Sequence, residues 1–130
     1  MALVGPSGSG KTTILHLIFR LYDSKAGEIS IDNFPVKDLD FTFRSKIAFV
    51  SQAPYLFNGT VMENLRYANS EATEEEVFAL MKELDLHDEI MELPKKYDTN
   101  VGEKGSIFSG GQKQRISLIR ALLKLSLIHI

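Results

Sequence analysis

The chain has 130 residues, 44% of them hydrophobic, which is enough for one hydrophobic core and one domain. Its formal net charge of −2 gives no sign of a nucleic-acid groove or a polybasic membrane tether. The lack of cysteine excludes disulfides and thiolate metal sites. The sequence contains neither a signal peptide nor an uncharged apolar run of about 18 residues. We therefore expect a soluble segment, with any membrane-spanning part supplied by another domain.

The N-terminal residues predict a strand, a loop and a helix in that order. Ala2–Val4 is a short apolar strand that leads into a glycine-rich loop. Apolar side chains recur at helical spacing between Ile14 and Leu21, so a helix is expected to begin at Lys11. This order of elements is the context in which a phosphate-binding loop occurs.

Two further strands are predicted before Thr60. Residues 27–33 alternate between polar and apolar and end in a turn, which indicates an edge strand or a hairpin. Residues 47–51 are more continuously apolar, which is typical of a strand buried on both faces. A loop is expected between the two strands, at residues 35–40.

Helices are predicted in the rest of the chain. Residues 60–63 and 73–76 are capping boxes, in which a threonine and a glutamate three residues later cap the first turn of a helix. A glycine-bracketed loop occupies residues 101–105, and a last helix follows Ser109 and ends near Lys124. The basic residues of this last helix are interpreted as a solvated face; they are Lys113, Arg115, Arg120 and Lys124.

The loop at residues 5–13 has the composition of a phosphate site. Glycines let successive backbone N–H groups turn into one concavity, and the helix that follows adds unpaired N–H groups and the positive end of its dipole. A lysine ammonium suits the β- and γ-phosphates, and a threonine hydroxyl suits Mg²⁺. An ordinary glycine and serine turn is the alternative, but it does not require this register of residue types. The candidate nucleotide-binding residues are Gly5, Ser7, Gly8, Ser9, Gly10, Lys11, Thr12 and Thr13, and Thr12 is also a candidate metal ligand.

A second anion-binding helix start is predicted at residues 109–112. Ser109 and Gln112 also form a capping box, which by itself would only begin a helix. Gly110 and Gly111 cost about 1 kcal/mol each in helix stability, and a capped helix gains nothing from them. Because glycine has no side chain, however, the backbone N–H groups at these two positions are accessible to an anion. All four residues are therefore candidate nucleotide ligands.

In order and spacing, these segments resemble the ABC-type ATPases. Residues 5–13 resemble the family's Walker A motif, Gln52 its Q-loop, and residues 108–112 its signature. Residues 57–65 and 99–105 resemble the exporter branch, which includes multidrug, lipid and peptide exporters. The resemblance covers nearly the whole chain. It implies an α/β fold, with a P-loop NTPase (RecA-like) core, an ABC-type antiparallel edge and a helical subdomain, incomplete at both ends.

The resemblance also implies a division of the chain into segments. Residues 1–60 would form the P-loop core with the Q-loop, and residues 61–107 the helical subdomain. Residues 108–124 would be the signature and its helix. Residues 125–130 form a tail that does not resemble the family.

ATP, Mg²⁺ and ATPase activity are what the family implies for function. In the family two such domains pair head to tail, and the signature of one closes over the ATP held by the other, so residues 109–112 would contact the partner's nucleotide. Gln52 would approach Mg²⁺ and the attacking water, and it is the candidate catalytic residue. Closure and reopening would drive export through a transmembrane domain, fused or separate, at the cytoplasmic face of the cell membrane. The segment 99–105 would lie near that domain.

The sequence departs from the family in several places. Phe108 stands where the family usually has leucine, and no acidic residue follows Glu103. The family's metal-binding aspartate and water-activating glutamate therefore have no counterpart, since Asp32 is interpreted as a hairpin residue. His129 is not interpreted as the family's later phosphate-contacting histidine. We expect Mg-nucleotide binding with negligible turnover, and marginal stability from a sheet that lacks neighbouring strands.

Two alternative functions remain open from the sequence. One is a soluble ABC-type ATPase of DNA repair or chromosome organisation, which also uses a Ser-Gly-Gly signature. Such proteins usually carry long coiled-coil or zinc segments between the motifs, and this chain is compact and free of cysteine there. The other is a fragment of the exporter domain with no activity of its own.

Overall fold

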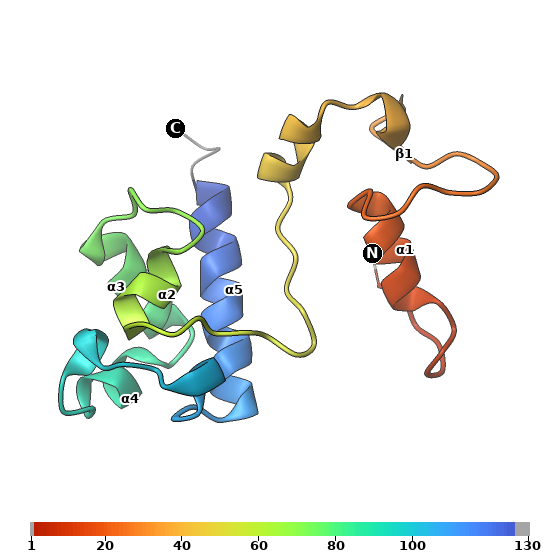
Figure 1. Ribbon diagram of the computed structural model, residues 1–130. Helices are drawn as coiled ribbons and strands as arrows, with labels where there is room; N and C mark the ends of the chain where they lie inside the picture. Colours follow the sequence, from red (N-terminus) through yellow and green to blue (C-terminus); the bar gives the residue numbers. More distant parts are fainter. Residues whose placement is uncertain (1, 127–130) are drawn as a thin grey trace. The chain divides into compact units, whose positions relative to one another are not determined.

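The computed structural model describes residues 2–126 and combines helices with a small amount of strand. The chain divides into two compact units, Met1–Ile47 and Ala48–Ile130, which are described separately below (Figure 1). Residues 127–130, most of the predicted atypical tail and with them His129, lie outside the described residues.

The first unit contains one helix and a hairpin. Helix α1 (Lys11–Ile18) begins where the sequence predicts it. Strands β1 (Ser30–Ile31) and β2 (Phe34–Pro35) pair antiparallel. The turn between them has positive φ at both central residues, 50° and 66°, the conformation that a tight two-residue hairpin requires. Short 3₁₀ helices follow at Val36–Asp38 and Phe41–Lys46.

The longer predicted strands do not form in the described residues. Residues 2–4 and 47–51 are irregular, and the alternating segment 27–33 contributes only the two residues of β1. The predictions of a strand at 2–4 and of a buried strand at 47–51 are therefore wrong for this structure. A strand exists only when a neighbour pairs with its N–H and C=O groups. The hairpin forms because β1 finds its pairing strand, β2, only three residues further along the chain.

The second unit is helical. It contains α2 (Val61–Arg66), α3 (Glu74–Glu83), α4 (His87–Met91) and α5 (Gly110–Ser126), with 3₁₀ helices at Lys96–Asp98 and Glu103–Gly105. Helices α2 and α3 pack against the long blue helix α5 (Figure 1). One hydrophobic core lies between the helices, and its fully buried members include Leu56, Leu65, Met81, Leu86, Ile90, Ile116, Ile119 and Leu123.

Both predicted capping boxes are confirmed. The Thr60 hydroxyl accepts a hydrogen bond from the Glu63 amide at 3.1 Å, and the Glu63 carboxylate accepts one from the Thr60 amide at 2.7 Å. The same pair of bonds joins Thr73 and Glu76, at 3.2 and 2.8 Å. These contacts span three residues, so the local sequence is sufficient to set where α2 and α3 begin.

Arg120 is buried, contrary to the predicted solvated face of the last helix. The residue is only 9% exposed. Its guanidinium donates to the carbonyl oxygens of Asn64 at 2.6 Å and Tyr55 at 2.7 Å, and also to the Asn64 side-chain oxygen. Its position could have been predicted, because it lies four residues after Ile116 and three before Leu123, on the buried face of α5. Burial lowers the pKa of the Arg120 guanidinium, which remains charged at neutral pH.

Asn64 completes this network with its side-chain amide. Its oxygen also accepts from the Phe57 amide at 2.9 Å, and its nitrogen donates to the carbonyls of Phe57 and Thr60, both at 2.9 Å. The guanidinium of Arg120 also lies 5.4 Å from the centre of the Phe57 ring. The network therefore fixes the segment between Tyr55 and Thr60 against α2 and α5.

The burial of Tyr97 in the core predicts how the free energy of unfolding depends on pH. It is 7% exposed, and its hydroxyl lies 2.8 Å from Nδ1 of His87. Burial, with a smaller contribution from Asp88, raises the pKa of Tyr97 to about 12, above the ordinary value of about 10. The folded state therefore binds a proton that the unfolded state has lost, and the free energy of unfolding is expected to fall as the pH rises from about 10 through about 12.

The measurement is urea unfolding followed by far-UV circular dichroism across that range. The variant Tyr97→Phe is expected to show a smaller loss of stability than the unaltered chain between about pH 10 and about pH 12. Tyr22→Phe is the matched control, because Tyr22 is 65% exposed. An equal alkaline loss in the unaltered chain and in Tyr97→Phe would contradict the prediction.

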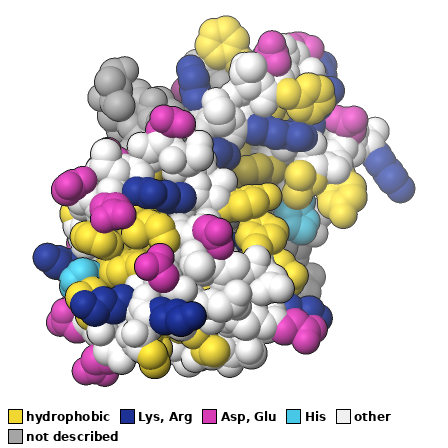
Figure 2. All heavy atoms as spheres, turned by 60° about the vertical axis from the view of Figure 1, so that its left-hand side comes forward, with side chains coloured by type: hydrophobic (Ala, Val, Ile, Leu, Met, Phe, Trp, Pro, Cys, Tyr) yellow, Lys and Arg dark blue, Asp and Glu magenta, His cyan; other side chains and the backbone are white. Residues whose placement is uncertain are grey.

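In the part of the chain that the structure describes, no helix combines the length and apolar character needed to cross a bilayer. On the face shown in Figure 2, acidic and basic side chains are interspersed with hydrophobic ones, in line with the small net charge of the chain. Large apolar side chains are nevertheless exposed in the second unit; they include Phe49, Tyr55, Tyr67, Ile107 and Leu118.

Candidate functional site

The glycine-rich loop in the first unit has the backbone of an anion cradle. Gly8 and Gly10 have φ values of 81° and 87°, a region that L-residues rarely adopt. Gly10 caps α1 without any side-chain hydrogen bond, and the first helical bond runs from the Ile14 amide to the Gly10 carbonyl at 3.0 Å. The amides of the first turn are therefore left to an anion or to solvent.

Lys11 lies over this loop. Its ammonium donates to the carbonyl oxygens of Gly5 at 2.8 Å and Pro6 at 2.7 Å and to the Ser9 hydroxyl at 3.1 Å. A Cβ at Gly5 would lie 2.9 Å from the Ser9 hydroxyl, so a larger residue there would displace the Ser9 side chain that accepts from Lys11. The ammonium is thus held beside the amides of the loop, where it suits a phosphate chain.

The remaining loop residues suit the same ligand. Thr12 and Thr13 lie in the first turn of α1 and are exposed, as is Ser7 at the tip of the loop. A hydroxyl next to a phosphate-binding lysine is a hard oxygen donor of the type that Mg²⁺ prefers. No group of three His, Asp or Glu side chains converges to hold a metal within the described residues.

The second predicted anion site lies in the second unit, at the start of α5. The Ser109 hydroxyl accepts from the Gln112 amide at 3.2 Å, and the Gln112 side-chain oxygen accepts from the Ser109 amide at 2.7 Å. A Cβ on Gly110 or Gly111 would meet nothing within 4 Å. Packing within this chain therefore does not require these glycines, whereas access of an anion to their amides does.

Gln52 is in the same unit as this helix start. Its carbonyl accepts a hydrogen bond from the Gln114 side chain at 3.4 Å. A hollow of about 640 Å³ lies between the two segments, and its lining is Val50, Ser51, Gln52, Gly111, Gln114, Arg115 and Leu118. Gln52 is exposed, so its side-chain amide is accessible to a ligand. The structure thus brings the predicted catalytic residue and the signature segment to one surface.

Sequence reasoning missed two residues beside this helix start. Glu89 on α4 accepts hydrogen bonds from Gln112 and from Arg115 of α5. Glu89 and Gln112 are 23 residues apart, and no periodicity within either helix predicts the contact. Arg115 was predicted on a solvated face, but it donates to the carbonyl oxygens of Leu84 and Asp85.

The chain is similar to known proteins over nearly its whole length. The family model described as "ABC transporter" matches residues 1–130. An ABC transporter B family member 24, mitochondrial, from Arabidopsis thaliana is 48% identical over 95% of this chain and 18% of its own length. The Iron-sulfur clusters transporter ATM1, mitochondrial, from Gibberella zeae is 46% identical, with 95% of this chain and 18% of its length covered.

A solved structure agrees with the sequence matches. It is described as a bacterial Atm1-family ABC exporter with ATP bound, and it is 42% identical to this chain with a TM-score of 0.87. The alignment covers 92% of this chain and 21% of the exporter chain. This chain thus spans about a fifth of the length of these proteins.

Proposed function

Because the chain belongs to the ABC transporter family, we propose that it is the ATP-binding part of an exporter that couples ATP binding and hydrolysis to transport across a membrane. Support comes from the match over the whole chain and from exporter relatives of the Atm1 type. The observation that carries the proposal is the glycine-rich loop, where the Lys11 ammonium and the unpaired amides of the first turn of α1 lie together.

In this proposal the residues at the end of the loop and in the first turn of α1 have distinct roles. The amides of residues 8–13 hold the phosphates, Lys11 pairs with the β- and γ-phosphates, and the Thr12 hydroxyl is a ligand of Mg²⁺. Mg²⁺, when bound, neutralises part of the phosphate charge. Thr13 contacts the α-phosphate, and Gln52 orients the attacking water and the metal. The proposal divides the chain into a P-loop core with the Q-loop at residues 1–60, a helical subdomain at residues 61–107, and the signature with its helix at residues 108–124.

A second copy or a related domain completes the site in this proposal. Ser109, Gly110 and Gly111 contact the γ-phosphate of the nucleotide that the partner's loop holds, in a head-to-tail pair. The open surroundings of both glycines support this role. A transmembrane domain, fused or separate, receives the movement near residues 99–105, and the ATP-binding part works at the cytoplasmic face of the membrane.

Nucleotide binding by the chain itself tests the proposal. We expect Lys11→Ala to weaken binding of Mg-ATP by about 10- to 100-fold, because a hydrogen bond from a charged group contributes about 1.5–3 kcal/mol. Titration with a fluorescent ATP analogue in excess Mg²⁺ measures the affinity. The matched control is Lys25→Ala, which removes an exposed lysine of the same unit and is expected to change the affinity by less than about twofold.

ATP hydrolysis is measured separately from Mg-ATP binding. Binding of Mg-ATP that does not depend on Lys11 would overturn the proposed nucleotide site. Hydrolysis at a rate ordinary for this family, abolished by Lys11→Ala, would leave the site intact and contradict the expectation of negligible turnover.

A further inference from the structure

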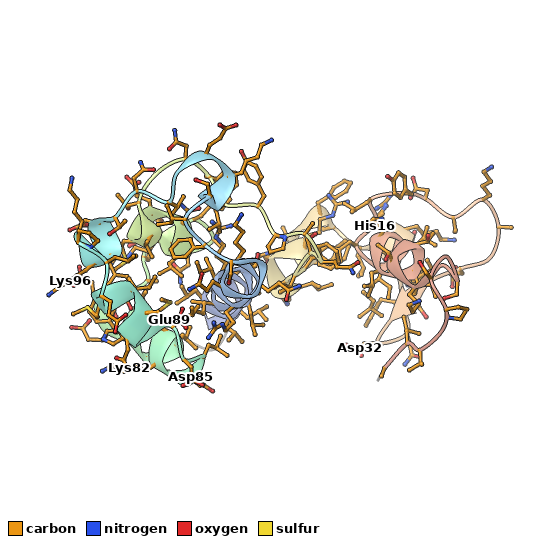
Figure 3. All side chains as sticks on the ribbon, turned by 90° about the horizontal axis from the view of Figure 1, so that it is seen from below. His16, Asp32, Lys82, Asp85, Glu89 and Lys96 are labelled. Carbon is orange, nitrogen blue, oxygen red and sulfur yellow. The ribbon has the colours of Figure 1, made fainter. Side chains whose placement is uncertain are left out.

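Glu89 connects α4 to the first turn of α5. Its carboxylate accepts a hydrogen bond from the Gln112 side-chain nitrogen through one oxygen and from Arg115, at 3.3 Å, through the other. Figure 3 labels Glu89 on α4, beside the end-on blue helix α5. The two acceptor oxygens therefore hold two side chains of one helix turn at once.

Arg115 is itself anchored to the end of α3. The guanidinium donates to the carbonyls of Asp85 at 2.9 Å and Leu84 at 3.3 Å, where a positive φ of 52° at Asp85 ends the helix. Carbonyls at a helix C-terminus have no helical partner and attract a cation. The contact thus gives the Glu89–Arg115 pair a fixed support outside α5.

The contact with Glu89 also fixes which way the Gln112 amide faces. The Gln112 oxygen accepts from the Ser109 amide, and its nitrogen donates to Glu89. In the flipped orientation the nitrogen would face the Ser109 N–H and the oxygen would face a carboxylate, and both contacts would be repulsive. Glu89 therefore selects the orientation that completes the cap on Ser109.

This cap determines which groups an incoming anion can use. The Ser109 hydroxyl accepts from the Gln112 amide, so its own proton is left to donate. The Ser109 amide is occupied by Gln112, whereas a Cβ on Gly110 or Gly111 would meet nothing within 4 Å, so no side chain covers this part of the first turn. The cap thus leaves one hydroxyl proton and the two glycine amides of the first turn for an anion. The paired Arg115 offsets the negative charge that Glu89 would otherwise present to the anion.

We propose that Glu89 is a positioning residue, which holds the start of α5 in the geometry that binds the γ-phosphate of a nucleotide carried by a second copy of this chain. The inference rests on the proposed function. Its effect is on geometry more than on folding, because Arg115 and Glu89 are 36% and 43% exposed and such ion pairs add little to stability.

The test uses pairs of chains in which only one shared site is intact. The first chain carries Lys11→Ala and supplies only its α5 start. The second carries Gly111→Asp, which fits sterically but repels phosphate, and supplies only its glycine-rich loop. Association of the two chains with and without Mg-ATP is measured by fluorescence anisotropy. Glu89→Ala is then placed in one chain or the other.

A positioning role predicts an effect that depends on where the substitution is placed. Glu89→Ala in the first chain is expected to weaken ATP-dependent association by about two- to tenfold, the equivalent of one or two hydrogen bonds. The same substitution in the second chain is expected to change nothing. Glu89→Gln retains an oxygen for the Gln112 nitrogen and is expected to restore most of the association. Glu92→Ala, an exposed glutamate at the end of α4, controls for the loss of charge.

Each outcome separates the inference from the function on which it rests. Equal weakening from either chain, stronger association, or no change overturns the positioning role and leaves the shared site intact. If the Lys11→Ala and Gly111→Asp chains, with Glu89 unaltered in both, do not associate in the presence of Mg-ATP, the shared site and the positioning role are both overturned. Binding of Mg-ATP to the loop of the single chain is tested independently by the titration of Lys11→Ala.

Discussion

Replacing Arg120 with methionine is expected to lower the free energy of unfolding of the second unit by about 3 kcal/mol, enough to unfold a marginal domain. The guanidinium donates to two residues that lie 56 and 65 positions away in the sequence. Methionine fills most of the volume, but it removes the side-chain donor of the Tyr55 and Asn64 carbonyls and leaves the Asn64 side-chain oxygen with the Phe57 amide alone. Buried polar groups without partners cost about 1–3 kcal/mol each.

Two further variants show whether the hydrogen bonds are responsible. Arg120→Lys keeps the charge but cannot reach three acceptors at once, and it is expected to recover only part of the loss. Lys113→Met, two turns earlier in α5, removes a lysine whose side chain makes no hydrogen bond in the described part of the chain, and it is expected to cost under about 0.5 kcal/mol. Urea unfolding followed by circular dichroism gives the values. Equal losses from Arg120→Met and Lys113→Met would refute the assignment.

Gly105→Ala is expected to cost the second unit about 2–4 kcal/mol in the free energy of unfolding. Gly105 is buried and has a φ of 69°, so alanine would be strained there. A Cβ would lie 2.7 Å from Cδ1 of Leu56 and 3.0 Å from its Cβ and Cγ. Leu56 is fully buried, so moving it would disturb the packing of the core around it.

A double-mutant cycle tests this overlap directly. Leu56→Ala removes the atoms that the new methyl group would meet, so Gly105→Ala is expected to cost less in that background than in the unaltered chain. Gly102→Ala is the control for backbone strain in the same loop. Gly102 has a φ of 74° and a ψ of −178°, a region almost restricted to glycine, so alanine is strained there as well, but its Cβ would chiefly meet the flexible Ser106 side chain. Coupling to Leu56→Ala is expected at Gly105 and not at Gly102, and equal coupling at both positions would show that the overlap is unimportant.

The sequence predicted the local geometry of the candidate site better than it predicted the strands. The glycine-rich loop, the start of α1 and the cap at Ser109 all depend on contacts within about six residues, and all have the predicted local geometry. The strands at residues 2–4 and 47–51 depend on neighbours that residues 2–126 do not provide. The apolar pattern of a segment indicates a preference for strand, but pairing with another segment decides whether the strand forms.

The sequence by itself determined the local geometry of the two segments at which we propose that phosphates bind, because glycine conformation, helix capping and the dipole of a helix are local properties. Tertiary structure decided which charged residues hold the helices together. Arg120 and Glu89 make their contacts with partners 56 and 23 residues away, and such contacts exist only once α2, α4 and α5 have packed. A charged residue is solvated by default, and only the fold can bring enough hydrogen-bond partners around it to bury it or hold it in place.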